Sequence, residues 1–209
     1  MKKIMFNDRY GLTKAVLDGK KTMTRRIIPI DLYNQTDWKA VAEGDFEAVV
    51  DGEGDYHDIR RCGMYHIGEV VAVAQSYHAL NKSGFIAPEW CEHTCESSAG
   101  YENKMFVRAD LMPHRIRITG IKVERLQDIS EEDAMREGVF KYDKPPLHHE
   151  GDMFAPWAPY VRPYKWDSNN LIYRCTARYA FAYLIDKISG RGTWQRNPWV
   201  YVYTFELLK

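Results

Sequence analysis

The stretch Leu17-Asp-Gly-Lys-Lys-Thr-Met-Thr-Arg-Arg26 joins a short predicted helix to a predicted strand. Before it, Asn7 is a suitable N-cap for a helix over residues 8–18, in which apolar residues recur at helical spacing. Gly19 can take the left-handed conformation that ends a helix. The sequence therefore predicts that the basic residues and hydroxyls lie on an exit turn and on a strand over residues 21–28.

The side chains of this strand alternate between its two faces. One face carries Lys21, Met23 and Arg25, and the other carries Thr22, Thr24 and Arg26. Cations next to hydroxyl groups suit the binding of a phosphate, a carboxylate or a developing oxyanion. The alternative is a solvated basic turn at the edge of a sheet, because short basic runs are common on protein surfaces.

Periodic patterns predict the other main elements. Apolar, β-branched and aromatic runs predict strands at residues 68–77, 104–109, 115–126 and 199–207. Ser130 has capping-box character and begins a helix that stops at Gly138. Residues 174–188 predict a longer amphipathic helix, whose apolar positions include Tyr179, Tyr183 and Leu184. No internal repeat and no boundary between two cores is visible, so we expect one domain over residues 1–209, with loop insertions near 31–62, 80–103 and 141–170.

Three segments, taken together and in order, resemble a known family. They are Gly-Lys-Lys-Thr-Met-Thr-Arg-Arg at 19–26, the strand and short helix at 117–138, and the closing strand at 192–206. This order is similar to that of the ASCH domain, a branch of the PUA-like superfamily, in the version common in phages and prophages. The resemblance covers about half of the residues. It implies an α/β (α+β) fold: a small mixed, mostly antiparallel β-barrel with flanking helices and a cleft beside the basic turn.

The resemblance also implies an activity. Some members of the family are small amidohydrolases that remove an acyl group from modified cytidines, using a lysine, a threonine and a glutamate that match Lys21, Thr24 and Glu137 here. A threonine hydroxyl needs a base to become a nucleophile, and a lysine is a base only where its pKa is lowered. Glu137 would pass the proton to the leaving amine or orient a water. Without the resemblance, Glu137 would be interpreted as a solvated residue at a helix end.

The predicted strand at 68–77 departs from the family pattern, which there usually reads Gly-Asp-x-Leu-Trp-Val-Arg-Glu-x-Trp. This chain has Ala74 and Gln75 in place of the charged pair, and Tyr77 keeps an aromatic ring. If the pair contacts ligand in relatives, specificity or activity has changed here, and if it only stabilises the barrel, its loss is silent. We expect ligand contacts from Lys20, Thr22, Arg25, Arg26, Gln75 and Tyr77.

Two non-catalytic functions compete with the amidohydrolase. PUA-like folds often hold RNA or a modified base in the same cleft, so the first alternative is a binding module of phage or prophage origin. Aromatic and basic residues alternate in the proline-rich segment and would suit stacking on bases: Trp157, Tyr160, Arg162, Tyr164, Lys165 and Trp166. The same rings could instead cover the core. The second alternative is a cleft that binds a small nucleotide as a signal.

Composition limits the partners. The formal net charge is zero, so no global field draws the chain to nucleic acid or a membrane, and any nucleic-acid site must be local. No apolar run is long enough to span a membrane, and no secretory signal is apparent, so we expect a cytoplasmic protein. We predict a nucleoside or single-stranded RNA as partner, no cofactor and no membrane. The sequence indicates no particular protein partner.

Four cysteines, Cys62, Cys91, Cys95 and Cys175, raise the question of a metal. Cys91 and Cys95 have the spacing of a zinc ligand pair, and Cys62 or His78 could complete a set. Structural zinc sites usually use two such close pairs, and only one is present. We therefore predict no metal site, and reduced thiols in the cytoplasm.

Overall fold

The structure is a computed structural model, which describes residues 1–85, 95–141, 157–159 and 176–208. Its main sheet has five strands in the order β1-β5-β6-β9-β2. They are β1 (Lys3–Ile4), β5 (Val70–Val73), β6 (Arg115–Arg125), β9 (Trp199–Leu208) and β2 (Met23–Ile27). Only the pairing of β1 with β5 is parallel. The prediction of a mixed α/β fold with a mostly antiparallel sheet is confirmed.

The closed barrel that the resemblance implies is not found in the described part of the chain. β1 and β2 form the two edges of the sheet and do not pair with each other. The two edges come close just after β1, where the Arg26 guanidinium donates a hydrogen bond of 2.8 Å to the backbone oxygen of Met5. The two edges of the sheet are therefore joined here by one side-chain hydrogen bond, whereas the edges of a closed barrel are joined by a series of backbone hydrogen bonds. We call this gap between Met5 and β2 the seam.

The long strands β6 and β9 form the centre of the sheet and pair along almost their full length. Alternate residues of β9 are large and aromatic, which suits a half-buried pleated surface. The register shifts at Gly120, where an added Cβ would lie 2.7 Å from Oγ1 of Thr204. The bulge therefore needs a residue without a side chain at this point. Both strands begin and end within a residue or two of the predicted positions.

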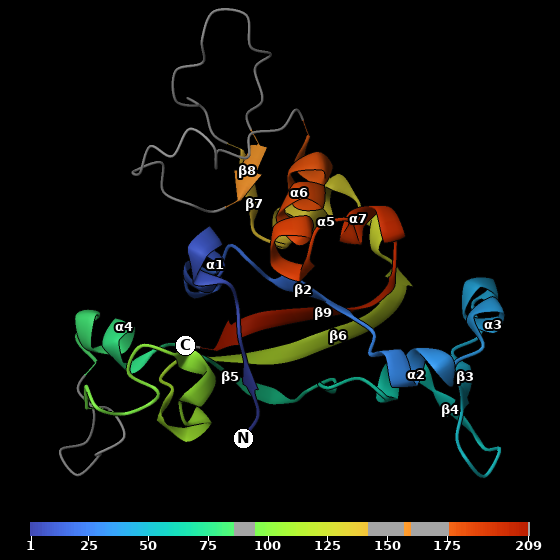
Figure 1. The fold of residues 1–209 in the computed structure, drawn as a ribbon, viewed down its shortest axis with the longest axis horizontal. Helices are drawn as coiled ribbons and strands as arrows, with labels where there is room; N and C mark the ends of the chain where they lie inside the picture. Colours follow the sequence, from blue (N-terminus) through green and yellow to red (C-terminus); the bar gives the residue numbers. More distant parts are fainter. Residues whose placement is uncertain (86–94, 142–156, 160–175, 209) are drawn as a thin grey trace, which may run out of the picture.

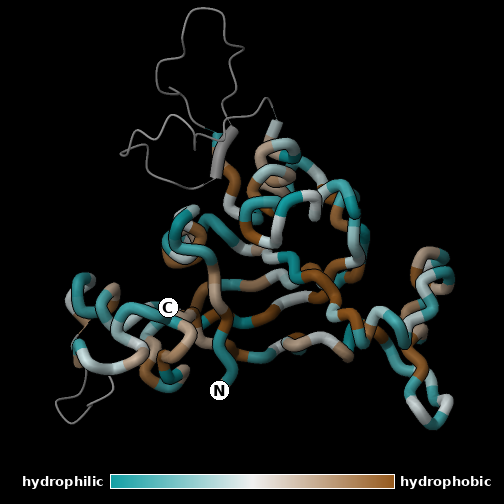
Figure 2. Tube along the Cα trace, viewed as in Figure 1, coloured by the Kyte–Doolittle hydropathy of each residue, from teal (hydrophilic) through white to brown (hydrophobic). Residues whose placement is uncertain are grey.

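Four helices lie over one face of the sheet (Figure 1). They are α1 (Leu12–Leu17), α5 (Glu131–Arg136), α6 (Ala177–Ser189) and α7 (Thr193–Arg196). The apolar face of α6 includes Phe181 and Leu184, both buried against the sheet. Figure 2 shows the brown, apolar segments in the strands and in the helix faces that meet them. Tyr179 does not belong to this face: its side chain is 56% exposed, so its predicted place in the apolar stripe is wrong.

The predicted helix over residues 8–18 is split in two. A 3-10 helix, η1 (Asp8–Tyr10), comes first, and Asn7 caps it by accepting a hydrogen bond from the backbone nitrogen of Arg9. Gly11 then turns the chain with a φ of 65° before α1 begins. Gly19 has a φ of 69°, as the predicted left-handed end of the helix requires.

The predicted insertions carry more regular structure than loops. Residues 31–62 contain two helices, a hairpin around the turn at 51–55 and a 3-10 turn: α2 (Ile30–Asn34), α3 (Trp38–Glu43), β3 (Glu47–Val50), β4 (Tyr56–Asp58) and η2 (Ile59–Arg61). The predicted strand at 104–109 is wrong, because the chain there forms two 3-10 turns, η4 (Lys104–Phe106) and η5 (Ala109–Leu111). β7 (Val139–Lys141) pairs with β8 (Trp157–Pro159), and the rest of 142–175 lies outside the described residues. Among the described helices, none has the length and apolar character needed to cross a bilayer.

Candidate functional site

The basic turn is positioned by backbone bonds on both of its sides. The backbone nitrogens of Lys20 and Lys21 both donate to the carbonyl of Ala15 in α1, at 2.9 Å. One residue later, the Thr22 nitrogen donates to the carbonyl of Arg136 at the end of α5. These bonds place Lys21 between two helix ends, with its side chain directed into the protein.

Glu137 reaches the same place from the other direction. Ser130 caps α5 by accepting a hydrogen bond from the Asp133 nitrogen, as predicted. The helix ends at Glu137, and Gly138 follows with a φ of 100°. A Cβ at Gly138 would lie 3.0 Å from Leu12 and 3.4 Å from the Lys21 side chain. This glycine therefore allows the end of α5 to approach the basic turn closely.

Lys21 and Glu137 form a buried ion pair. The ammonium of Lys21 donates to Oε2 of Glu137 at 2.7 Å, to the backbone oxygen of Glu137 at 2.6 Å and to that of Met23 at 2.7 Å. The two residues are only 2% and 4% exposed. A charged lysine has three protons to donate, and each has an acceptor here.

Arg25 extends this pair into a cluster of charges. Its guanidinium donates to Oε1 of Glu137 at 3.1 Å, so the Glu137 carboxylate lies between two cations. It also donates to Oε1 of Glu124 at 2.6 Å and to Oδ2 of Asp133 at 3.2 Å. Sequence reasoning missed both of these acids. The sequence contains no signal for Glu124, because strand alternation puts it on the face opposite to apolar Val123, where a solvated charge is expected, whereas it is buried here.

Burial sets the protonation behaviour of the lysine. Removal from water lowers the pKa of Lys21, and the neighbouring Arg26 and Arg25 lower it further. The Glu137 carboxylate acts in the opposite direction but does not cancel the effect of burial. Lys21 therefore reaches its neutral, basic form at a lower pH than an exposed lysine does.

A cavity of about 180 Å³ lies beside the ion pair. Lys21, Thr24, Arg25 and Glu137 line it, and Arg26 belongs to the same wall. The remaining walls are mainly apolar and come from the N-terminal segment and α6: Phe6, Leu12, Phe181, Leu184 and Ile188. The structure thus brings Lys21, Thr24 and Glu137 together in one cavity with Arg26, as the sequence predicted. The wall of the cavity thus combines a lysine, a threonine and a glutamate with apolar residues.

The other residues of the basic turn differ in position. Thr24 is buried in the cavity wall. Thr22 faces away from the cavity, and its hydroxyl accepts a hydrogen bond of 3.3 Å from Nε of Arg136. Lys20 is exposed, and its ammonium lies 5.5 Å from the centre of the Phe140 ring. Arg26 bridges the seam to Met5. Thr22 and Lys20 therefore do not line the cavity.

Gln75 and Tyr77 lie apart from this site. Tyr77 begins the helix α4 (Tyr77–Lys82) and belongs to a second, smaller apolar cluster with Leu80 and Met112. Its hydroxyl accepts a hydrogen bond from the Arg108 nitrogen at 2.9 Å. Gln75 is buried, and its Oε1 has no hydrogen-bond partner in the described part of the chain. Neither residue lines the cavity next to Lys21.

The predicted absence of a metal site stays a prediction. Cys62 and Cys95 are exposed free thiols, and within the described ranges no three His, Cys, Asp or Glu side chains gather as metal ligands would. Cys91 and Cys175 lie outside those ranges. The same is true of the predicted stacking residues Tyr160, Arg162, Tyr164, Lys165 and Trp166, while for Trp157 only the backbone, in β8, is described.

Comparison with known proteins gives no relative. No family model, no curated protein and no solved structure matches this chain. The resemblance to the ASCH domain therefore remains an interpretation of the sequence motifs.

Proposed function

We propose that this protein is an amidohydrolase that removes the acyl group from an N-acylated cytidine. One observation carries the proposal: the buried pair of Lys21 and Glu137, joined at 2.7 Å, lines the same small cavity as Thr24. These are the three residue types that an acyl transfer to threonine needs, and the sequence motifs match them to the catalytic residues of the ASCH amidohydrolases. The proposed place of action is the cytoplasm.

The ion pair can supply both a base and an acid. A proton that moves along the hydrogen bond from Lys21 to Glu137 leaves a neutral amine and a carboxylic acid, and the lowered pKa of Lys21 makes the loss of its proton easier. The amine can then take the proton of the Thr24 hydroxyl as its oxygen attacks the acyl carbon. The carboxylic acid can protonate the departing amine of the base, so the acyl–nitrogen bond breaks as the acyl–oxygen bond forms. Water then hydrolyses the acyl-threonine and restores the hydroxyl.

The arginines have separate parts in this scheme. Arg25 binds Oε1 of Glu137, which leaves Oε2 as the oxygen that exchanges a proton with Lys21. Arg26 lines the cavity and has further N–H groups that can stabilise the oxyanion. Loss of one such donor typically costs on the order of 10²–10³ in rate.

A second function, binding without catalysis, is favoured by a different observation. All three protons of the Lys21 ammonium have acceptors, and none of these acceptors is Thr24. A satisfied buried ion pair of this kind can serve only to hold β2 and α5 together. The cavity would then bind a modified base, free or in single-stranded RNA, and leave it unchanged.

The two functions differ in turnover of a free nucleoside. We expect the parent protein to convert N4-acetylcytidine to cytidine and acetate, measured by chromatography of the products. Thr24→Val should lower the rate on the order of 10²–10⁴-fold, because it removes the nucleophile but keeps the shape of the side chain. The matched control is Lys14→Ala, which removes an exposed lysine of α1 and should leave the rate unchanged. Binding of acetylcytidine without any product would favour the binding module.

A further inference from the structure

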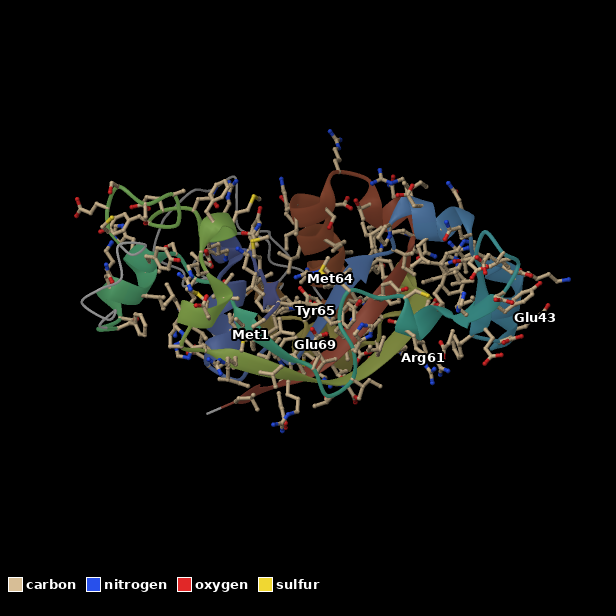
Figure 3. The ribbon with its side chains drawn as sticks, turned by 90° about the horizontal axis from the view of Figure 1, so that it is seen from below. Met1, Glu43, Arg61, Met64, Tyr65 and Glu69 are labelled. Atoms are coloured by element: carbon tan, nitrogen blue, oxygen red, sulfur yellow. The ribbon has the colours of Figure 1, made fainter. Side chains whose placement is uncertain are left out.

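A groove of about 510 Å³ lies where the insertion that begins with α2 leaves the main sheet (Figure 1). Figure 3, viewed from below, shows this insertion at the right, with Glu43 at its outer end. The walls of the groove come from the end of β2, from α2, and from residues at the ends of β6 and α7. We call it the arginine groove, because Arg125 and Arg196 both line it.

Apolar side chains along the arginine groove are open to solvent. Ile27 is 42% exposed, Ile30 67% and Tyr33 36%. Ile30 and Tyr33 are three residues apart on α2, so they are neighbours on its surface. No residue of α2 is buried, so this short helix gains little from packing within the chain. Adjoining apolar side chains that stay exposed are typical of a surface that a partner covers.

The two arginines have no carboxylate partner in the described part of the chain. Arg125 donates one hydrogen bond, of 3.2 Å, to the carbonyl of Asn197. Arg196 donates to Oγ1 of Thr193 at 2.9 Å and to the carbonyl of Arg191 at 3.4 Å. A guanidinium has five N–H donors, so each arginine keeps donors for a ligand. The groove therefore places positive charge that is not neutralised beside exposed apolar side chains.

A stack of aromatic rings supports the groove from within. The ring of Tyr33 lies 4.8 Å from that of Trp38, which in turn stacks on Trp199 of β9 at 4.9 Å. The Arg125 guanidinium lies 4.6 Å from the centre of the Trp199 ring. Trp199 itself is buried and serves as a support. Tyr33 and Arg125 are thus held in place before a ligand arrives, which lowers the entropic cost of binding.

The side chains of the groove favour a protein as the partner. Single-stranded nucleic acid binds to rings that stack on bases and to cations that follow the phosphates. Here the exposed apolar side chains are mainly aliphatic, and no lysine lines the groove within the described ranges. Exposed apolar side chains next to arginine and tyrosine are typical of contacts between proteins. A two-fold dimer through this groove would bring the arginines of both copies together, so the partner is a different, acidic protein.

We propose that the arginine groove is the docking site for a segment of another protein that carries a carboxylate next to aliphatic side chains. The carboxylate pairs with Arg196 and Arg125, and the aliphatic side chains pack on Ile30 and Tyr33. This docking site is separate from the proposed hydrolysis, because Lys21, Thr24 and Glu137 line a different cavity.

The probe is a library of random dodecapeptides displayed on yeast and selected for binding to the parent protein. The affinity of the enriched peptides is then measured for two variants of the groove, Ile30→Asp and Arg196→Glu. The matched controls are Ile67→Asp and Arg61→Glu. Ile67 is 67% exposed, as Ile30 is, and Arg61, labelled in Figure 3, is an exposed arginine of η2. Neither control residue lines the groove.

We expect the enriched peptides to carry Asp or Glu close to Leu, Ile or Val. Ile30→Asp and Arg196→Glu should each weaken binding at least roughly tenfold, as loss of a central interface residue does, and both controls should bind as the parent does. Circular dichroism checks that each variant is folded.

Four results would overturn the assignment. They are no enrichment of any peptide, enriched peptides without acidic residues, unchanged binding by Ile30→Asp and Arg196→Glu, and equal weakening by the controls. Sedimentation of the parent tests the remaining occupant: a dimer that Ile30→Asp converts to a monomer would show that a second copy of this chain covers the groove, and would also contradict the proposal.

Discussion

At the scale of single residues, the centre of the molecule is one carboxylate between two cations. Glu137 accepts from Lys21 through one oxygen and from Arg25 through the other. Taking these charges out of water is costly, and the pair is stabilising only because each group is hydrogen bonded. Loss of Lys21 and loss of Glu137 therefore have different consequences. Without Lys21, the Glu137 carboxylate is still paired with Arg25. Without Glu137, the Lys21 ammonium loses its only anionic partner among the described residues.

This inequality gives a prediction on stability. Glu137→Leu should lower the free energy of unfolding by about 3–5 kcal/mol, the usual cost of leaving a buried charge unpaired. Lys21→Met should cost less, because Glu137 stays paired with Arg25. Urea unfolding measures both. Arg117→Ala, which breaks an exposed ion pair with Glu206, is the control and should cost less than about 1 kcal/mol. Equal costs for Glu137→Leu and Arg117→Ala would contradict the account.

The lowered pKa of Lys21 gives a prediction on pH. The folded-state pKa lies below the unfolded value of about 10.4, so between the two values the unfolded chain binds more protons than the folded one. Stability contributed by this residue must therefore rise with pH across that window. The difference in unfolding free energy between the parent and Lys21→Met, measured by urea unfolding from neutral pH to about pH 10, should move in favour of the parent. A difference that is flat or falls with pH would contradict the burial of this amine.

At the scale of elements, two turns bring β2 and α5 together. Gly19 ends the stretch after α1 and Gly138 ends α5, both with positive φ. Their surroundings differ: nothing lies within 4 Å of a Cβ added at Gly19, whereas one at Gly138 would press on Leu12 and the Lys21 side chain. The first glycine is needed for its conformation alone, and the second for conformation and space.

Alanine at these two positions should therefore have different effects. Gly19→Ala should cost about 1–2 kcal/mol, the usual penalty of a left-handed alanine. Gly138→Ala should cost more and also lower the rate of deacylation, because the strained backbone and the contact of the added Cβ with Leu12 at 3.0 Å shift the end of α5, which carries Glu137. Thermal unfolding and the hydrolysis assay check the two effects. If Gly138→Ala kept full activity, close approach of α5 to the basic turn would not matter to the chemistry.

Elements with strong periodicity could be predicted from the sequence, and those shaped by their neighbours could not. The alternation in β9 and the capping residue of α5 indicated both elements correctly. Lys21 and Arg25, predicted to share a face, both contact Glu137, but Thr24, predicted on the other face, lines the same cavity. The run at 104–109 has strand-like residues, but Lys104 donates to the carbonyl of Phe6 and ties the segment to η1 instead of to a sheet. Tertiary contacts of this kind cannot be predicted from the local sequence.

At the scale of the whole molecule, the sheet curves without closing. Its edges approach each other at the seam through Arg26, and the closed barrel that the resemblance implies is not found among the described residues. The cavity beside Lys21 lies next to this seam. The resemblance implied a cleft beside the basic turn, but it did not indicate the apolar walls, which come from the N-terminal segment and from α6. An open seam gives a ligand access to the interior that a closed ladder of backbone bonds would block.

The seam should be sensitive to Arg26. In Arg26→Met the hydrogen bond to Met5 is lost, so β1 should separate from the sheet more often. Hydrogen exchange should become several-fold faster at the nitrogens of Ala72 and Ala74, which donate to β1, because a charge-assisted bond contributes on the order of 1 kcal/mol. Amides between β6 and β9 serve as the internal control and should be unchanged. If hydrogen exchange became faster across the whole sheet, or did not change at all, Arg26 would not be what holds the two edges of the sheet together.

The central claim is that Lys21 moves protons and is not only a partner for Glu137. The most direct test is the rate of N4-acetylcytidine hydrolysis by Lys21→Ala, with and without added small primary amines. We predict a loss on the order of 10²–10⁴-fold, followed by recovery in proportion to the concentration of free amine that enters the space left by the side chain. Hydrolysis by Lys21→Ala at the rate of the parent protein, or a loss that no amine restores although the fold is intact, would contradict the claim.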